Sequence, residues 1–206
     1  MNTILILFFC ALVSSTSHAG NLQEFCVADL KDSDSPSGYH CKPPNTVTAA
    51  DFKHTFGPGI PAPTKSTLYP ATVVQVPALN GLGISAGRVE IEKGGSLPLH
   101  THAANEILIM HQGEMTVGLL TPTRAYVNKL KPGDLTVFPD GLQHYLVNSG
   151  NEKAVAFATY SSPNPRIDFL YQILFANNVS ANTIAQTTFL DEPQVRKLQA
   201  RFNGGS

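Results

Sequence analysis

Four residues in two short segments have the types and the spacing of a metal site. The first segment carries His100, His102 and Glu106, and the second carries His144. Three neutral imidazole nitrogens and one carboxylate oxygen suit a divalent first-row metal ion. Alternate residues of a strand point to the same side, so a strand would let His100 and His102 reach one ion. Glu106 keeps that parity if the strand continues, and the sequence therefore predicts a metal site with these four ligands.

Turn residues bracket both segments. Gly94, Gly95 and Pro98 precede or interrupt the first, and Pro139-Asp140-Gly141 reads as a tight turn just before His144. We expect these residues to aim the strands that carry the ligands. Asn148 closes the second segment, and we expect it to fix the strand or support the ligands rather than touch the metal.

Short strands separated by turns occupy the middle of the chain. The candidate strands are residues 72–76, 84–90, 106–111, 115–120, 125–130, 135–138, 143–148 and 154–160. Many short strands at this spacing favour an antiparallel sandwich or barrel. Leu108 and Met110 share the parity of Glu106 and are expected to line the cavity wall, whereas His111 should point away from it.

The two flanking regions differ from this middle part. Residues 20–66 are rich in Pro, Ser, Gly and Asp, and they predict an extended arm that wraps the barrel, with Phe52, Phe56 and Ile60 as anchors. Residues 163–206 contain an apolar stretch at 167–175 and apolar residues at helical spacing over 192–202. The pattern predicts a helical tail whose apolar face is buried on the barrel or on a neighbouring subunit.

The start of the chain is typical of a secretory signal peptide. Residues 4–13 form an apolar run that is too short for a membrane span, and Ser17 and Ala19 fit a cleavage site after residue 19. Cys10 would leave with that segment. Cys26 and Cys41 would remain, and in an oxidising compartment they predict a disulfide, worth about 3 kcal/mol by loop entropy. The alternative is a thiolate metal site, but no histidine pair lies near these cysteines.

Composition excludes other classes of protein. The formal net charge is −1 and the Lys and Arg residues are scattered, which argues against nucleic-acid binding. Beyond the start of the chain, no apolar stretch is long enough to span a bilayer. Asn178-Val179-Ser180 is an N-glycosylation sequon, although a packed helix in that region would mask it.

The two ligand segments match known motifs without a mismatch. Residues 94–113 fit the cupin motif G(X)5HXH(X)3E(X)6G, and residues 133–148 fit G(X)5PXG(X)2H(X)3N. With Lys-Pro-Pro at 42–44, Gly-Leu-Gly-Ile-Ser at 81–85 and Leu-Phe-Ala-Asn at 174–177, the chain resembles plant germin-like proteins and is most similar to their auxin-binding branch. The resemblance implies an all-β fold, a single-domain cupin jelly-roll β-barrel with a C-terminal helical arm. The expected divisions are a signal peptide (1–19), an N-terminal arm with the disulfide (20–66), the barrel (67–162) and the helical extension (163–206).

The resemblance also carries expectations about metal, assembly and location. It implies manganese, a homohexamer built as a trimer of dimers, and secretion to the apoplast or cell wall. The ligand types themselves also admit iron, cobalt, nickel or zinc. Four protein ligands on a six-coordinate ion leave two positions open for water, superoxide, dioxygen or a carboxylate.

Three functions fit such a site, and the sequence separates them. Superoxide dismutation to hydrogen peroxide and dioxygen needs an open redox site and protons but no elaborate pocket. Oxalate oxidation, the activity of true germins, is not expected, because oxalate-oxidising members carry asparagines where this chain has Leu97 and Gly87, which supply no donors to a dianion. Third, Leu97, Leu99 and Gly87 would give an apolar, roomy mouth that suits auxin or another apolar carboxylate. The protein would then be a receptor-type binder or a metal-dependent enzyme acting on a specialised metabolite.

Overall fold

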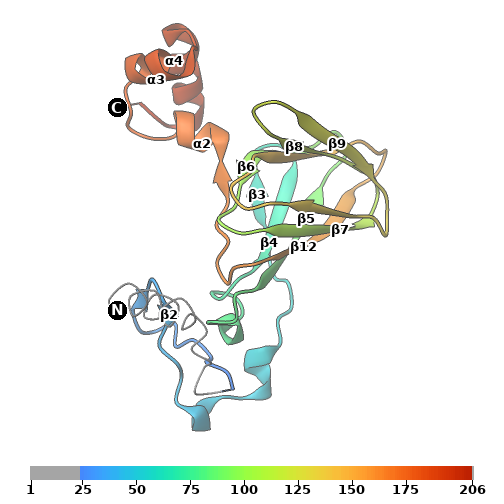
Figure 1. Cartoon of the computed structure of the whole chain (residues 1–206), viewed down its shortest axis with the longest axis vertical. Coiled ribbons are helices and arrows are strands. Elements are labelled where there is room, and N and C mark those ends of the chain that lie inside the picture. The colour runs from blue at the N-terminus through green and yellow to red at the C-terminus, as the bar shows by residue number, and fades with distance from the viewer. Residues whose placement is uncertain (1–23, 206) are drawn as a thin grey trace, which may run out of the picture.

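Two antiparallel β-sheets face each other and form the body of the molecule (Figure 1). The computed structural model describes residues 24–205, so the expected signal peptide, with Cys10, lies outside the described residues. The six-stranded sheet has the strand order β10-β7-β12-β5-β4-β3, and the five-stranded sheet has the order β13-β6-β11-β8-β9. This arrangement confirms the predicted all-β jelly-roll fold.

The strands are short, and sequence neighbours often lie in different sheets. The six-stranded sheet contains β3 (Ile60–Ala62), β4 (Ser66–Ala71), β5 (Ser85–Ile91), β7 (Glu106–Gln112), β10 (Leu135–Phe138) and β12 (Ala154–Tyr160). The five-stranded sheet contains β6 (Ser96–Thr101), β8 (Met115–Leu120), β9 (Ala125–Leu130), β11 (His144–Asn148) and β13 (Asp168–Phe169). A small hairpin, β1 (Asp34–Ser35) and β2 (Gly38–Tyr39), lies in the N-terminal region.

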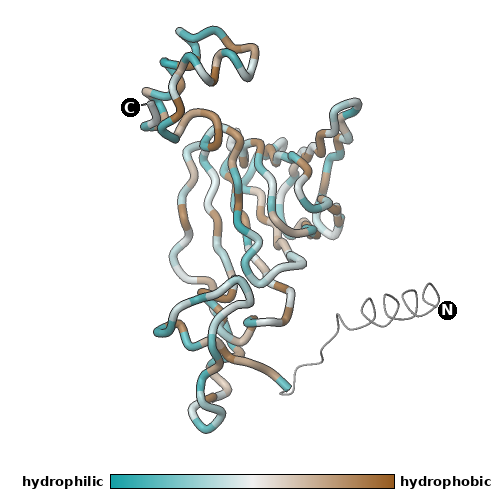
Figure 2. The backbone as a smooth tube through the Cα atoms, turned by 60° about the vertical axis from the view of Figure 1, so that its left-hand side comes forward, coloured by the Kyte–Doolittle hydropathy of each residue, from teal (hydrophilic) through white to brown (hydrophobic). Residues whose placement is uncertain are grey.

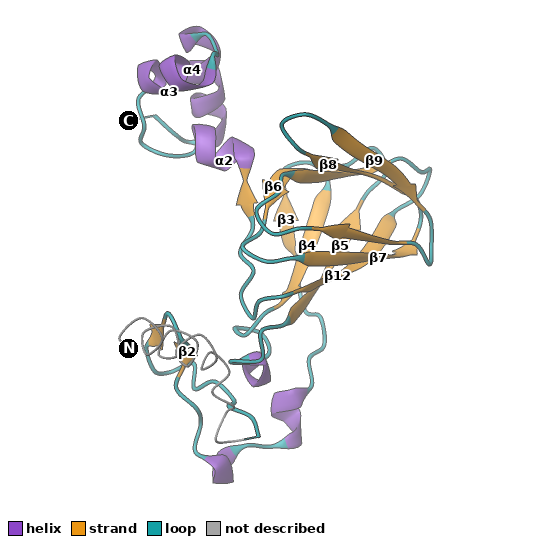
Figure 3. Ribbon diagram, in the orientation of Figure 1, coloured by secondary structure: helices purple, strands orange, loops and turns teal. Residues whose placement is uncertain are grey.

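Helices are confined to the two ends and one connection (Figure 3). Three short 3-10 helices precede β5, namely η1 (Pro44–Thr46), η2 (Ala49–Phe52) and η3 (Pro77–Leu79). Three α-helices follow β13, namely α2 (Leu170–Phe175), α3 (Ala181–Thr188) and α4 (Glu192–Phe202). No helix within residues 24–205 has the length and apolar character needed to traverse a bilayer.

Alternation of inward and outward residues builds the core between the sheets. In β7, Leu108 and Met110 are buried while Ile107 and Ile109 are exposed, which is the period of a strand with one buried face. Figure 2 shows hydrophobic and hydrophilic residues interspersed along the strands of the barrel. The core also takes large side chains from other strands, including Ile91, Met115, Val117, Phe138 and Leu146.

Two strand predictions differ from the structure. Residues 72–76 were expected to form a strand, but they form a turn, because the Thr72 backbone N–H and hydroxyl both donate to Gln75 Oε1, at 3.1 and 2.8 Å. The strand at this place is β4, which ends at Ala71. The sequence pattern also missed β6, the strand that holds His100.

The N-terminal region is fixed by a disulfide of its own and by hydrogen bonds to Pro77 and Asn80 in the connection between β4 and β5. Cys26 and Cys41 form the predicted disulfide. Of the expected anchors, only Phe56 packs on an outward-facing strand residue, with its ring 6.3 Å from that of Phe157. Phe52 instead contacts Phe25 in an edge-on pair at 5.2 Å, and Ile60 is 57% exposed on the edge strand β3.

Of the C-terminal helices, α2 contacts the barrel strands β6 and β13, whereas α3 and α4 pack on one another and α4 packs on α2. Phe175, Ala181, Ile184 and Val195 are buried in a small core of their own, which Tyr171 joins to the barrel core. Figure 1 shows this helical tail projecting from the sheets. The tail was expected to bury its apolar face on the barrel or on a neighbouring subunit. Within this chain, α3 and α4 bury their apolar residues against the other helices of the tail.

Candidate metal centre

The four predicted ligands come from both sheets and meet at one end of the barrel. His100 lies in β6, His102 follows directly after that strand, and His144 opens the neighbouring strand β11. Glu106 does not continue the strand of the two histidines, as the parity argument assumed. The chain turns at residues 102–105, and Glu106 opens β7 in the opposite sheet.

A bulge in β6 sets the direction of His100. His144 pairs with His100 and Leu146 pairs with Leu97, so two residues of β6 stand opposite one residue of β11. Such a bulge reverses the parity of the strand beyond it. Leu97 and His100 consequently face the same side of the sheet, although they are three residues apart, and Leu99 does not join them.

Local contacts hold the turn before His144 against the other ligand segment. The Gly141 N–H donates to the His102 carbonyl at 3.1 Å, and the Asp140 N–H donates to Asn105 Oδ1 at 3.2 Å. The ring of Phe138 stacks on the His144 imidazole, with ring centres 4.2 Å apart and planes 11° apart. The predicted turn therefore fixes both the position and the plane of this imidazole.

The ligand atoms converge in a buried cluster. One ligand atom from each of the four side chains lies within 4.8 Å of the other three. Glu106 Oε2 is 3.2 Å from the Nε2 atoms of both His102 and His144. All four residues are at most 5% exposed, so the cluster is shielded from bulk water.

Each imidazole is oriented by a backbone carbonyl. His100 Nδ1 lies 2.7 Å from the Pro98 carbonyl oxygen and His144 Nδ1 lies 2.9 Å from that of Leu142. His102 Nδ1 makes the same kind of bond to the Arg166 carbonyl. A carbonyl only accepts, so each Nδ1 carries a proton, and in the neutral form each ring would direct its Nε2 lone pair into the cluster.

The cluster fits a cation because its acceptors face one another. Glu106 Oε2 and His144 Nε2 are buried and have no hydrogen-bond partner within residues 24–205. Leaving such groups unpaired is costly, and a metal ion or an added proton on an imidazole would satisfy them. The donor set is that of a divalent metal, with three nitrogens, one oxygen and an outer layer of carbonyls.

Electrostatics keep two of the ligands in their metal-binding forms. Burial, with His144 nearby, lowers the pKa of His100 to about 3, so this imidazole stays neutral at ordinary pH. Burial alone would raise the pKa of Glu106, but the imidazoles of His102 and His144, each 3.2 Å from its carboxylate oxygen, hold it at about 2. The carboxylate is therefore an anion over the whole physiological range.

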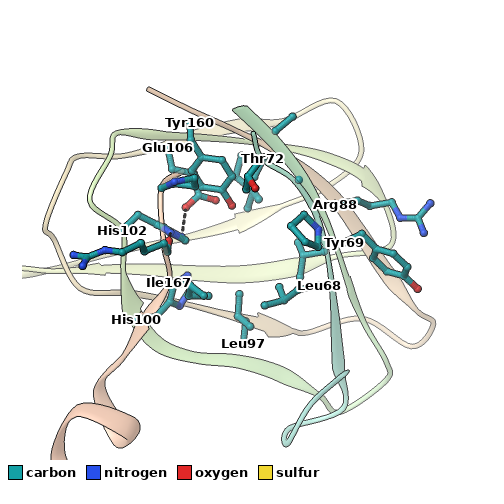
Figure 4. A pocket seen from close by; sticks show the side chains of 18 of the residues that line it. Leu68, Tyr69, Thr72, Arg88, Leu97, His100, His102, Glu106, Tyr160 and Ile167 are labelled. Carbon is teal, nitrogen blue, oxygen red and sulfur yellow. Dashed lines mark hydrogen bonds and ion pairs between the residues drawn. The ribbon is translucent and has the colours of Figure 1, made fainter. Parts of the chain in front are cut away.

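A cavity of about 180 Å³ opens beside the cluster (Figure 4). His100, His102 and Glu106 contribute to its wall. The remainder is mostly apolar and includes Leu68, Val89, Leu97, Leu108, Leu146 and Ile167. Of the five residues predicted to shape this space, Leu97, Gly87 and Leu108 line it, whereas Leu99 and Met110 do not. Met110 is buried in the barrel core, and the bulge turns Leu99 away.

The remaining predicted residues have structural surroundings. Asn148 donates to the carbonyl oxygens of Ile91 and Glu152, at 2.8 and 2.7 Å, and is not a member of the ligand cluster. His111 is exposed and packs against Phe157 on the outer face of β7. These positions match the expectation that both residues lie outside the set of metal ligands.

Tyr160 is one of several cavity residues that the sequence interpretation missed. It ends β12, where buried Ala154, Ala156 and Ala158 alternate with outward residues, so its ring follows the same inner face. That alternation is visible in the sequence and would have placed Tyr160 inside the barrel. Its ring lies 4.9 Å from the His102 imidazole.

The fold is that of a cupin, the buried cluster of three histidines and a glutamate is able to hold a metal ion, and comparisons with known proteins show the family. The family model described as Cupin matches residues 57–196. Auxin-binding protein ABP19b of Prunus persica is 44% identical over 205 residues, which cover 97% of each chain. Germin-like protein 8-14 of Oryza sativa subsp. japonica is 44% identical over 191 residues, 88% of this chain and 87% of the relative.

A solved structure supports the same family assignment. Oxalate oxidase in complex with the substrate analogue glycolate superposes with a TM-score of 0.83 at 31% identity, covering 90% of this chain and 98% of that one. The chain belongs to the cupin family and, within it, to the germin-like proteins.

Proposed function

We propose that this chain is a secreted, manganese-binding germin-like protein that dismutates superoxide and does not oxidise oxalate. The observation that carries the proposal is the buried contact between Glu106 and two imidazole nitrogens, which leaves acceptors facing acceptors until a cation is bound. A hard carboxylate with three imidazoles and no thiolate is compatible with manganese, with iron and zinc as the alternatives. The two cysteines of the N-terminal region are joined in their disulfide and offer no ligand.

The surroundings of the ligands suit a small anionic substrate. When bound, a redox-active metal supplies the one-electron steps that turn two superoxide ions and two protons into hydrogen peroxide and dioxygen. The residues of this chain hold the three imidazoles in fixed orientations through backbone carbonyls and keep His100 neutral. The cavity gives superoxide and water a route to the site. Its wall is mostly apolar, and a substrate as small as superoxide needs no specific contacts with that wall.

The same cavity argues against oxalate as a substrate. Gly87 and Leu97 both line it, and neither side chain offers a hydrogen bond to a dianion. Oxalate would bring a second full negative charge against Leu68 and Leu146, and a neutral donor such as the Tyr160 hydroxyl does not compensate for burying that charge. We expect metal-loaded protein supplied with oxalate to release no hydrogen peroxide, and steady peroxide release would contradict this part of the proposal.

The apolar wall favours a second candidate function. An apolar carboxylic acid such as an auxin could place its carboxylate at the metal and its hydrocarbon part against the leucines of the cavity. The protein would then act as an extracellular binder of receptor type, or as a metal-dependent enzyme on a specialised metabolite. Saturable binding of indole-3-acetate that disappears when the metal is removed would favour this function over dismutation.

Secretion, glycosylation and assembly belong to the same proposal. A disulfide is compatible with an oxidising compartment such as the apoplast or cell wall. Asn178 of the sequon is exposed, between α2 and α3, where an oligosaccharide would find room. The outer faces of β7 and β10 expose Ile107, Ile109, Leu135 and Val137, and covering them would suit the hexamer implied by the family.

The experiment is superoxide dismutase activity per bound metal ion in secreted protein whose metal has been quantified. Metal-stripped protein and His100→Ala are expected to be inactive. His111→Ala is the matched control, because it removes an exposed histidine from the outer face of β7 and should keep both metal and activity. Bound metal without dismutation in the unaltered protein would reject the proposal and direct attention to carboxylate binding.

A further inference from the structure

Tyr160 brings a free hydrogen-bond donor to the cavity beside the ligand cluster. Its ring contacts the His102 imidazole at 4.9 Å, with planes inclined by 56°, and its Cα pairs with that of Glu106 across the β12–β7 ladder. Figure 4 shows the Tyr160 ring next to Glu106, at the end of the cavity where the ligands meet. The phenol therefore lies beside the space that a molecule bound at the metal would occupy.

The hydroxyl of Tyr160 has a proton to donate and no acceptor among the residues that the structure describes. Among residues 24–205 no side chain or carbonyl is hydrogen-bonded to it. A phenol keeps its proton at physiological pH, because its ordinary pKa is about 10. A half-buried donor without an acceptor is unfavourable unless water or a ligand supplies one.

Gly87 leaves the space in front of this hydroxyl open. A Cβ at position 87 would lie 3.7 Å from Tyr160 Cε2 and 3.9 Å from the hydroxyl oxygen, in ordinary contact. Any longer side chain at position 87 would fill the region toward which the phenol points. The donor that position 87 lacks is thus supplied from the neighbouring strand β12 of the same sheet, and the room remains available to a ligand.

We propose that the Tyr160 hydroxyl selects carboxylic acids that carry a second oxygen on the carbon next to the carboxylate, as in 2-hydroxy and 2-oxo acids with an apolar substituent. The inference rests on the proposed metal site, which attracts the carboxylate. The second oxygen accepts the hydrogen bond from Tyr160, and the apolar substituent lies against Leu68, Val89 and Leu146. A cavity of about 180 Å³ is large enough for a phenyl ring, since about 150 Å³ holds benzene.

The test compares two acids that differ only in the second oxygen, mandelate and phenylacetate. Their dissociation constants are measured by calorimetry on manganese-loaded protein with quantified metal, for the unaltered chain and for Tyr160→Phe. Removing one neutral hydrogen bond should weaken mandelate about fivefold to tenfold and leave phenylacetate unchanged. Tyr69→Phe is the matched control, because Tyr69 lines the same cavity but its hydroxyl points away from the ligand cluster in Figure 4.

Each other outcome has a defined meaning. Equal weakening of both acids in Tyr160→Phe would assign the hydrogen bond to the carboxylate itself and overturn the proposed selectivity. Equal affinities in the variant and the unaltered chain, with metal-dependent binding retained, would overturn the role of Tyr160 alone. Failure of the unaltered chain to hold metal, or acid binding that persists after metal removal, would instead reject the metal site on which the inference depends.

Discussion

Asn148 and His144 lie four residues apart on β11, and replacing them is predicted to have different effects: loss of stability for Asn148 and loss of metal for His144. Asn148 makes three hydrogen bonds, donating to Ile91 O at 2.8 Å and Glu152 O at 2.7 Å and accepting from the Gly150 N–H at 2.9 Å. At about 0.5–1.5 kcal/mol each, Asn148→Ala should lower the free energy of unfolding by about 2–4 kcal/mol.

The assay separates this structural role from metal binding. The free energy of unfolding is measured by urea titration of metal-stripped protein, and bound metal is measured separately on loaded, folded protein. Asn148→Ala should lose stability and keep one metal per chain, whereas His144→Ala should lose the metal. Asn151→Ala is the control for the turn itself, since its exposed side chain should matter by less than about 0.5 kcal/mol.

One result would refute the reasoning about Asn148. If Asn148→Ala bound little metal while its unfolding midpoint stayed unchanged, the side chain would belong to the metal site rather than to the turn after β11. The hydrogen bonds to Ile91 and Glu152 would then be incidental to stability.

Three further predictions concern acid, backbone strain and the metal. Folding lowers the pKa of His100 from 6.5 to about 3 and that of Glu106 from 4.5 to about 2, so at low pH the unfolded chain binds more protons than the folded one. Metal-stripped protein should therefore lose stability as the pH drops below about 6.5. Urea midpoints that do not change with pH would contradict this. Arg166 has a φ of 49°, which is strained for a residue with a side chain, so Arg166→Gly should raise the free energy of unfolding by about 1 kcal/mol. The carbonyl at position 166 should still orient His102. A variant that is less stable, or that binds no metal, would argue against this. Removing the metal, when it is present at a hundred times its dissociation constant, should cost about 2.7 kcal/mol, or roughly 5–10 °C in thermal midpoint, and equal midpoints would argue against a specific site.

The ligand set could be predicted from sequence because it depends on residue types and even spacings. The course of the chain between the ligands could not be predicted in this way. A separation of four residues from His102 to Glu106 fits a continuing strand and also a turn into a new one, and only pairing with β10 and β12 places β7 in the opposite sheet. Local pattern carries no information about which sheet a strand joins.

Two errors arose because local backbone features override the strand pattern of the sequence. Residues 72–76 contain β-branched side chains typical of a strand, but the hydrogen bonds from Thr72 to Gln75 close a turn, and Pro70 hid the true strand β4 from the pattern. The bulge in β6 moved Leu99 out of the cavity, because one extra residue reverses the parity on which the prediction relied. Helix α4, whose apolar spacing is regular, was predicted with correct bounds.

The bond between the His102 ring and the Arg166 carbonyl joins residues that are 64 positions apart. Until the segment leading into β13 has paired with β6, His102 has no partner to fix its tautomer, and the cluster is one oriented imidazole short. If the proposed metal site is correct, capture of the ion is expected to come late in folding, once β13 has paired with β6. A bound ion would then indicate that the C-terminal segment has docked, and chains truncated before residue 166 are expected to bind less metal than the whole chain.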